Sequence, residues 1–88
     1  MDKNAIRDFI YERISDKLIL FNLDKAEVDK DFDLVKSGLL DSMAFVDLVA
    51  ALEEKFKVEI DFEQAAENDD FTRLGNLLIL IKNAPNAK

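Results

Sequence analysis

Residues 38–60 read GLLDSMAFVDLVAALEEKFKVEI and contain the strongest helical pattern in the chain. From Ser42 onward, large apolar side chains recur at intervals of three and four residues, which places them on one face of an α-helix. These side chains are Phe45, Leu48, Val49, Leu52 and Phe56. Asp41 precedes the pattern and can accept a hydrogen bond from the first turn. The stretch therefore predicts a helix over residues 42–56 that begins after an Asp N-cap.

The side of this helix that faces away from the apolar stripe mixes acidic and apolar residues. Its members are Asp41, Met43, Val46, Asp47, Ala50, Glu53 and Glu54. Such a mixture is typical of a docking surface, because the acids attract basic partners and the apolar groups add affinity. The alternative is that Met43 and Val46 are ordinary exposed apolar residues or lie under the preceding loop.

The rest of the chain predicts three more helices and one long loop. A stripe at four-residue spacing predicts a first helix over residues 3–21; its members are Ile6, Ile10, Ile14 and Leu18, widened by Phe9 and Phe21. Residues 22–40 predict a loop that folds back onto the core. A short helix over residues 62–67 and a last helix over residues 72–82 follow; Asp70 or Thr72 can cap the last one.

These elements predict an all-α fold, a four-helix bundle with three long helices, one short helix and a long loop between the first two. The core face of the last helix comprises Leu74, Leu77, Leu78 and Ile81, while Gly75 lowers its helix propensity. With 88 residues, the chain has the size of one small domain. We expect this domain to span residues 1–83 and a flexible tail to span residues 84–88.

Charge and composition exclude several classes of function. The formal net charge is −7, and residues 24–70 alone carry fifteen acidic and five basic residues. This balance argues against nucleic acid as a partner and favours proteins with basic surfaces. The absence of Cys and His removes thiolate nucleophiles, imidazole bases, disulfides and the usual zinc ligands. With no apolar run of about 20 residues, we expect a soluble, cytoplasmic monomer that does not bind membranes.

Ser42 falls in the first turn of the predicted helix over residues 42–56. Free backbone N–H groups and the positive end of the helix dipole lie there, so a phosphate ester on the hydroxyl would be favourably placed. Gly38, a few residues earlier, permits a turn that other residues resist. Serine is also common in first helical turns without any functional role.

The run from Gly38 to Phe56 strongly resembles the phosphopantetheine attachment region of acyl carrier proteins. The resemblance rests on the Asp41-Ser42-Met43 core at the head of an acidic helix. It continues through Leu52-Glu53-Glu54-Lys55-Phe56-Lys57-Val58-Glu59-Ile60 and Phe71-Thr72-Arg73-Leu74, and it covers nearly the whole chain.

This resemblance implies a carrier and not an enzyme, within an acyl-carrier-type bundle. In the family, a phosphopantetheinyl transferase moves 4′-phosphopantetheine from coenzyme A onto the serine that corresponds to Ser42. The thiol of the arm then holds an acyl group as a thioester, which supplies thiol chemistry to a chain without Cys. The expected partners are acyl-activating and acyl-transferring enzymes of fatty acid, lipid or polyketide-type synthesis, which carry basic docking surfaces.

The resemblance also assigns positions to other residues. The exposed positions of the helix over residues 42–56 match the family's partner-recognition positions. The family's acyl-chain cavity would be lined here by Phe45, Leu48, Val49, Leu52, Ile60 and Phe71.

The chain departs from the fatty-acid-synthesis members in ways that leave alternatives open. Leu39-Leu40 before Asp41 is closer to D-alanyl carriers and specialised stand-alone carriers. Asp61 stands where Pro or Thr often begins the short helix, and Lys55 and Lys57 dilute the acidic face. A D-alanyl or other aminoacyl carrier of a cell-wall or nonribosomal peptide pathway is therefore an alternative, as is an acidic interaction domain without a prosthetic group.

Two further classes find little support. Asp29, Asp31 and Asp33 match the start of an EF-hand calcium loop, but Leu34 and Leu40 occupy the positions that require Gly and Glu. A hydrolase with paired carboxylates would need an apolar pocket that raises one carboxyl pKa, and no stretch of the sequence predicts one.

Overall fold

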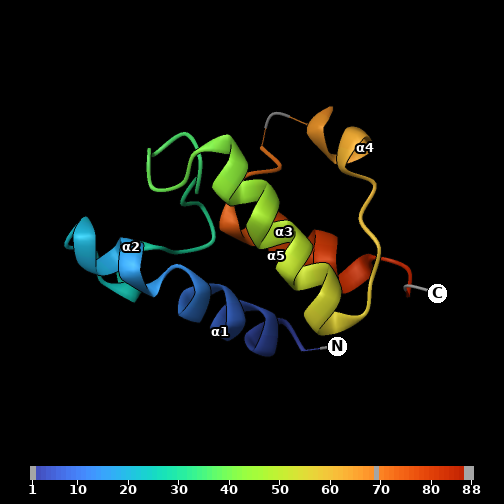
Figure 1. Ribbon diagram of the computed structural model, residues 1–88, viewed down its shortest axis with the longest axis horizontal. Coiled ribbons are helices and arrows are strands. Elements are labelled where there is room, and N and C mark those ends of the chain that lie inside the picture. The colour runs from blue at the N-terminus through green and yellow to red at the C-terminus, as the bar shows by residue number, and fades with distance from the viewer. Residues whose placement is uncertain (1, 69, 87–88) are drawn as a thin grey trace.

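The computed structural model describes residues 2–68 and 70–86, and this part of the chain is built from helices (Figure 1). They are α1 (Lys3–Arg13), α2 (Ser15–Leu20), the 3₁₀ helix η1 (Lys25–Glu27), α3 (Ser42–Phe56), α4 (Phe62–Ala66) and α5 (Leu74–Asn83). Two isolated β-bridges, Asp33–Arg73 and Val58–Asn86, join segments outside the helices. The all-α bundle expected from the sequence is confirmed.

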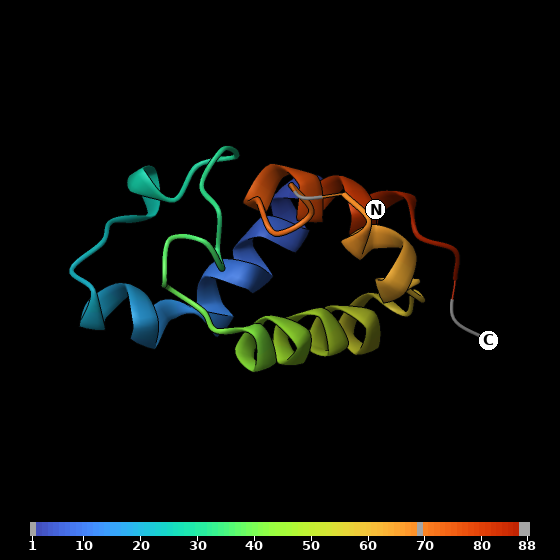
Figure 2. The same ribbon diagram turned by 90° about the horizontal axis from the view of Figure 1, so that it is seen from above.

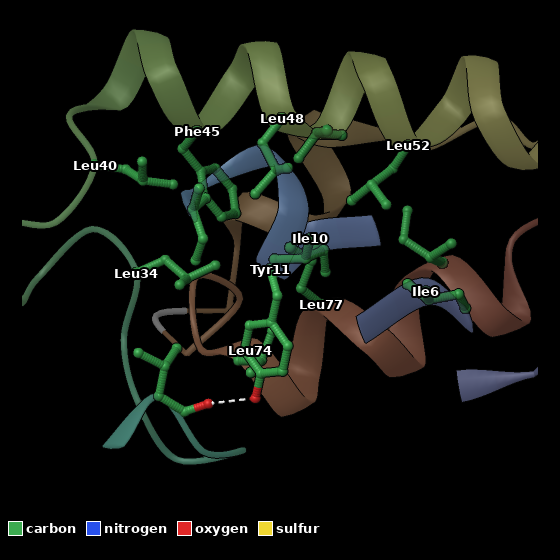
Figure 3. Packing of buried hydrophobic residues seen from close by; sticks show 14 of the residues in the cluster. Ile6, Ile10, Tyr11, Leu34, Leu40, Phe45, Leu48, Leu52, Leu74 and Leu77 are labelled. Atoms are coloured by element: carbon green, nitrogen blue, oxygen red, sulfur yellow. Dashed lines mark hydrogen bonds between the residues drawn. The ribbon is translucent and has the colours of Figure 1, made fainter. Parts of the chain in front are cut away.

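The core lies between α1, α3 and α5. α1 contacts both of the other two helices, and Figure 2 shows α3 and α5 on opposite sides of the bundle. Figure 3 shows the apolar side chains that meet in this space. Those with no exposed surface include Ile6, Ile10, Leu52, Leu77 and Ile81. The stripes read from the sequence therefore become the buried faces of three helices, because each helix places its apolar residues on one side.

The prediction of one continuous helix over residues 3–21 is wrong, because the structure divides this segment at Ile14 into α1 and α2. At the break, the Ser15 hydroxyl donates to the Glu12 carbonyl at 2.9 Å, a local bond of the kind that bends helices. Ile14 and Leu18 still reach the core, but Phe21 is 50% exposed and does not widen the buried stripe. Phe21 is the C-cap of α2, and the chain turns directly after it at Asn22, which adopts a left-handed conformation with φ 55°.

The long loop folds back onto the core, as predicted, and it is held there by α5. The N–H groups of Leu74 and Gly75 donate to the carbonyls of Phe32 and Lys30 at 2.9 and 2.8 Å. First-turn N–H groups have no partner within their own helix, so the loop backbone supplies the missing acceptors. The expected capping by Asp70 or Thr72 is therefore wrong: α5 begins at Leu74 after Arg73, which makes no side-chain cap bond.

Asp33 ties this loop to the segment before α5. Its Oδ1 accepts hydrogen bonds from Val35 N at 3.0 Å, Lys36 N at 2.7 Å and Thr72 Oγ1 at 2.7 Å. Burial alone would raise the pKa of Asp33, but these bonds and the nearby Lys36 charge lower it below its ordinary value of 3.8. The Asp33 carboxylate is thus ionised and holds the fold together. This structural role accounts for Asp33 without the calcium loop that the spacing of the aspartates suggested.

Tyr11 anchors the loop from the side of α1. Its hydroxyl donates to the Val28 carbonyl at 2.8 Å, as the dashed line in Figure 3 marks. Val28, Leu34, Leu39 and Leu40 are all buried. These contacts give an irregular segment enough apolar burial to hold one conformation.

The close contact between the loop at Lys30 and α5 is expected to require glycine at position 75. A Cβ at position 75 would lie 2.9 Å from both the Cβ and the carbonyl oxygen of Lys30. Gly75→Ala should therefore lower the free energy of unfolding by about 1–3 kcal/mol, although Ala is favoured in helices by about 1 kcal/mol. Urea unfolding measures this change. Lys82→Ala, on the exposed side of the same helix, should change it by less than about 0.5 kcal/mol, and a stabilised Gly75→Ala variant would contradict the proposed clash.

The segments after α3 are joined by backbone and side-chain bonds. Lys57 ends α3 in a left-handed conformation, and the N–H of Val58 donates to the Glu53 carbonyl at 3.1 Å. Asp61 caps α4 through a bond from Gln64 N at 3.1 Å, which gives this departure from the family pattern a structural role. α4 ends at Ala66, one residue before its predicted end.

The predicted division at residue 83 stays a prediction. Glu59 N donates to the Pro85 carbonyl at 2.9 Å, so part of the segment expected to be a tail contacts the body. Ala87 and Lys88 lie outside the described residues. Within the described ranges, each helix is too short or too polar to cross a membrane.

Candidate functional site

Ser42 is the first residue of α3, as the sequence predicts, and its side chain is exposed. Asp41 is the N-cap, and its Oδ1 accepts a hydrogen bond from Ala44 N at 2.7 Å. The carboxylate of Asp41 therefore serves the first turn, which leaves the Ser42 hydroxyl available at the surface.

The backbone before Ser42 is held by a compact turn. Leu40 N donates to the Leu34 carbonyl at 2.9 Å, and Gly38 N donates to the Val35 carbonyl at 3.0 Å. Gly38 has φ 87°, a conformation that side-chain-bearing residues rarely adopt. Because Leu39 and Leu40 are buried just before the helix starts, they anchor the turn that presents Ser42.

A groove of about 310 Å³ opens beside Ser42. Its lining residues are Val35, Lys36, Ser42, Phe45, Val46, Phe62, Ala66, Phe71 and Thr72. Three of them form an aromatic cluster: the Phe71 ring lies edge-on at 5.6 Å from both Phe45 and Phe62, measured between ring centroids. The groove thus combines an exposed hydroxyl with a largely apolar wall, which suits an attached arm that ends in an apolar group.

The six residues expected to line an acyl cavity all lie in or against the hydrophobic core, but the two hollows that include some of them share none. Phe45 and Phe71 line the groove beside Ser42. Leu48, Val49 and Leu52 are buried in the core. Ile60 lines a separate hollow of about 560 Å³ between the segment before α4 and the end of α5. The assignment of an acyl cavity to all six residues stays a prediction.

The residues expected to form a docking face lie on one exposed side of α3, with one exception. Met43 is 77% exposed and Val46 is 46% exposed, so the loop does not cover them. Asp41, Asp47, Ala50 and Glu54 are exposed as well. Glu53 is half-buried, and its Oε2 accepts a hydrogen bond from Ile60 N at 3.0 Å. That carboxylate therefore has a structural task in addition to any contact with a partner.

Sequence reasoning missed several residues of the groove. Val35, Lys36 and Thr72 come from two segments that are distant in sequence and are joined by hydrogen bonds from Thr72 Oγ1 to Asp33 and from Leu34 N to the Thr72 carbonyl. Phe62 and Ala66 enter from α4, which has no fully buried residue of its own. The sequence carries no periodic signal for such positions, because their meeting depends on contacts between distant segments.

Comparison with known protein families assigns the chain. A family model described as "Phosphopantetheine attachment site" matches residues 10–78, a range that includes Ser42 and the whole of α3. The chain belongs to this phosphopantetheine attachment site family. Phosphopantetheine is therefore its cofactor, as the resemblance implied.

Curated relatives support the same family. Over 44 residues the chain is 48% identical to an acyl carrier protein of Helicobacter pylori strain J99 and 50% identical to that of strain G27. It is 48% identical over 44 residues to the acyl carrier protein of Helicobacter acinonychis strain Sheeba. Each match covers 50% of this chain and 56% of the relative, so the chain spans about half the length of these relatives. No solved structure matches the chain.

Proposed function

We propose that this chain is an acyl carrier protein in which the Ser42 hydroxyl bears 4′-phosphopantetheine. The observation that carries the proposal is the exposed hydroxyl at the first position of α3, beside a largely apolar groove. When bound, the arm supplies a terminal thiol that can hold an acyl group as a thioester, in a chain whose sequence has no Cys.

The chain's own residues hold and present the attachment point. Asp41 keeps the first turn of α3 ordered, and the helix dipole there favours the negative charge of a phosphate ester. The aromatic rings of Phe45, Phe62 and Phe71 give the adjacent groove an apolar wall. The proposed role is carriage of a substrate, and the chemistry on that substrate belongs to partner enzymes.

The proposed partners are a phosphopantetheinyl transferase and acyl-activating and acyl-transferring enzymes in the cytoplasm. The names of the relatives favour an acyl cargo over an aminoacyl cargo. The Leu39-Leu40 pair, which pointed toward D-alanyl carriers, has a packing reason here because both side chains are buried. It therefore adds no independent support for an aminoacyl cargo.

Intact mass spectrometry tests the proposal. The chain is incubated with coenzyme A and a broad-specificity phosphopantetheinyl transferase, beside a known carrier protein as the positive control. We expect a gain of one phosphopantetheinyl unit. An unchanged mass, under conditions that modify the control carrier, would favour the interaction domain without a prosthetic group.

The acidic side of α3 is expected to control partner association. Asp47 and Glu54 are both exposed on this helix, so Asp47→Lys combined with Glu54→Lys reverses the local charge. At low salt this change should slow modification by the transferase about tenfold or more, because attraction between unlike charges speeds encounter. Initial rates measured across a salt series check the effect.

A second pair of substitutions separates the surface from the overall charge. Asp8→Lys combined with Glu12→Lys changes the net charge equally, but on the exposed side of α1. This control should slow the reaction far less. Equal slowing by both pairs would mean that net charge, and not the α3 surface, governs association.

A further inference from the structure

Lys36 is the one charged side chain among the described residues that line the groove beside Ser42. Its position is unusual, because residues 24–70 are strongly acidic and contain only five basic residues. Of the other lysines in this segment, Lys25 and Lys30 line a different hollow, beside α1 and α5. Lys55 lies in the last turn of α3 and Lys57 is its C-cap, both at the end remote from Ser42.

The backbone of Lys36 is held in place while its side chain remains exposed. Its N–H donates to Asp33 Oδ1 at 2.7 Å, and the same oxygen binds Val35 N and Thr72 Oγ1. The turn continues to Gly38, whose N–H bonds the Val35 carbonyl. A long, flexible side chain thus rises from a fixed point on the wall of the groove that contains Ser42.

Lys36 is also within electrostatic range of Asp33, because its charge contributes to the lowered pKa of that carboxyl. The ammonium therefore already acts on one anion, the Asp33 carboxylate. A lysine ammonium has three donors on a flexible stem and can be shared between two acceptors. A second anion added at Ser42 would lie on the same groove.

We propose that the Lys36 ammonium binds the phosphodiester of the phosphopantetheine arm on Ser42 and holds the base of the arm at the groove. This inference rests on the proposed function, because it requires the arm to be attached at Ser42. The phosphodiester adds a negative charge to the most acidic part of the chain, and Lys36 is the groove residue that can offset it. Lys36 is thus a cofactor-binding residue of this chain.

A comparison of apo and holo melting temperatures tests the inference. Each form is prepared for the unsubstituted chain, for Lys36→Met and for Lys55→Met. For each variant, the melting temperature of the apo form is subtracted from that of the holo form. This difference should be higher by about 2–5 °C in the unsubstituted chain than in Lys36→Met. Lys55→Met should behave like the unsubstituted chain, since Lys55 lies outside the groove.

Two further measurements separate an ion pair from a packing effect. In about 1 M salt the difference between the unsubstituted chain and Lys36→Met should shrink, because interactions between exposed charges are screened beyond about 3 Å at that ionic strength. Lys36→Arg, which keeps the charge, should restore most of the difference. The phosphorus resonance of the arm should shift between the unsubstituted chain and Lys36→Met but not between the unsubstituted chain and Lys55→Met.

The outcomes distinguish this inference from the proposed function. If the unsubstituted chain gains no mass with coenzyme A and transferase, the proposed function fails first. If the arm attaches but Lys36→Met shows the same change in melting temperature and the same phosphorus resonance as the unsubstituted chain, the role of Lys36 is refuted while the carrier function stands. Because each variant is compared with its own apo form, any loss of stability from Lys36 itself cancels.

Discussion

Ser42→Ala is expected to abolish phosphopantetheinylation completely and to leave the fold intact. The Ser42 side chain is exposed, and the N-cap hydrogen bond of α3 comes from Asp41. Ala is the most favourable residue in helices, so the free energy of unfolding should change by less than about 0.5 kcal/mol. Intact mass after treatment with coenzyme A and transferase measures the first effect, and urea unfolding measures the second.

Ser37→Ala provides a matched control for this variant. Ser37 precedes the same helix, and its Oγ accepts a hydrogen bond from Leu39 N at 3.2 Å. The Ser37 variant should gain one phosphopantetheinyl unit as the unsubstituted chain does. A mass gain in Ser42→Ala would show that another side chain accepts the arm, and the assignment of Ser42 would then be wrong.

Asp33→Ala is expected to lower the free energy of unfolding by about 2–4 kcal/mol. One carboxylate oxygen accepts bonds from two backbone N–H groups and from Thr72 Oγ1, and Thr72 is buried. The substitution leaves these donors without their acceptor and loosens the link between the loop and α5. Thr72→Val removes a single one of the three bonds, so it should lower the free energy of unfolding less than Asp33→Ala in urea unfolding.

The same carboxylate predicts how stability changes with pH. Its pKa is lower in the folded chain than its ordinary value of 3.8. The ionised form therefore stabilises the fold above pH 3.8, and this contribution is lost as the pH falls through the folded pKa. Asp33→Asn should lose less stability than the unsubstituted chain across that acidic range. Parallel pH profiles for the two proteins would contradict the role given to Asp33.

The sequence predicted α3 and its surroundings most accurately, because several local signals agree there. The apolar spacing, the Asp41 cap and the acidic outer face all point to one helix, and its bounds are those observed. Periodicity likewise identified the buried faces of α1 and α5. Where a single local signal stood alone, as at Phe21 or at Thr72 as a cap, the tertiary structure overrode it.

The groove beside Ser42 could not be predicted from the sequence, for a physical reason. Its walls come from the loop, α3, α4 and the segment before α5, which meet only after the chain has folded. The roles of Asp33 and Lys36 depend on the same long-range contacts. Two of the three aspartates whose spacing matched the start of a calcium loop, Asp29 and Asp33, instead accept hydrogen bonds from backbone N–H groups, and Asp33 also accepts one from a hydroxyl.

The sequence by itself determined the helical class, the acidic face, the placement of Ser42 at a helix start and the family. These properties depend on residue type, on the spacing of residues within a few positions and on local capping, all of which are local features of the sequence. Only the tertiary structure decided where the first helix breaks, what caps α5 and which residues surround Ser42. Those features depend on hydrogen bonds and packing between segments far apart in sequence. Backbone groups at helix ends need hydrogen-bond partners, and the tertiary structure decides which segment supplies them.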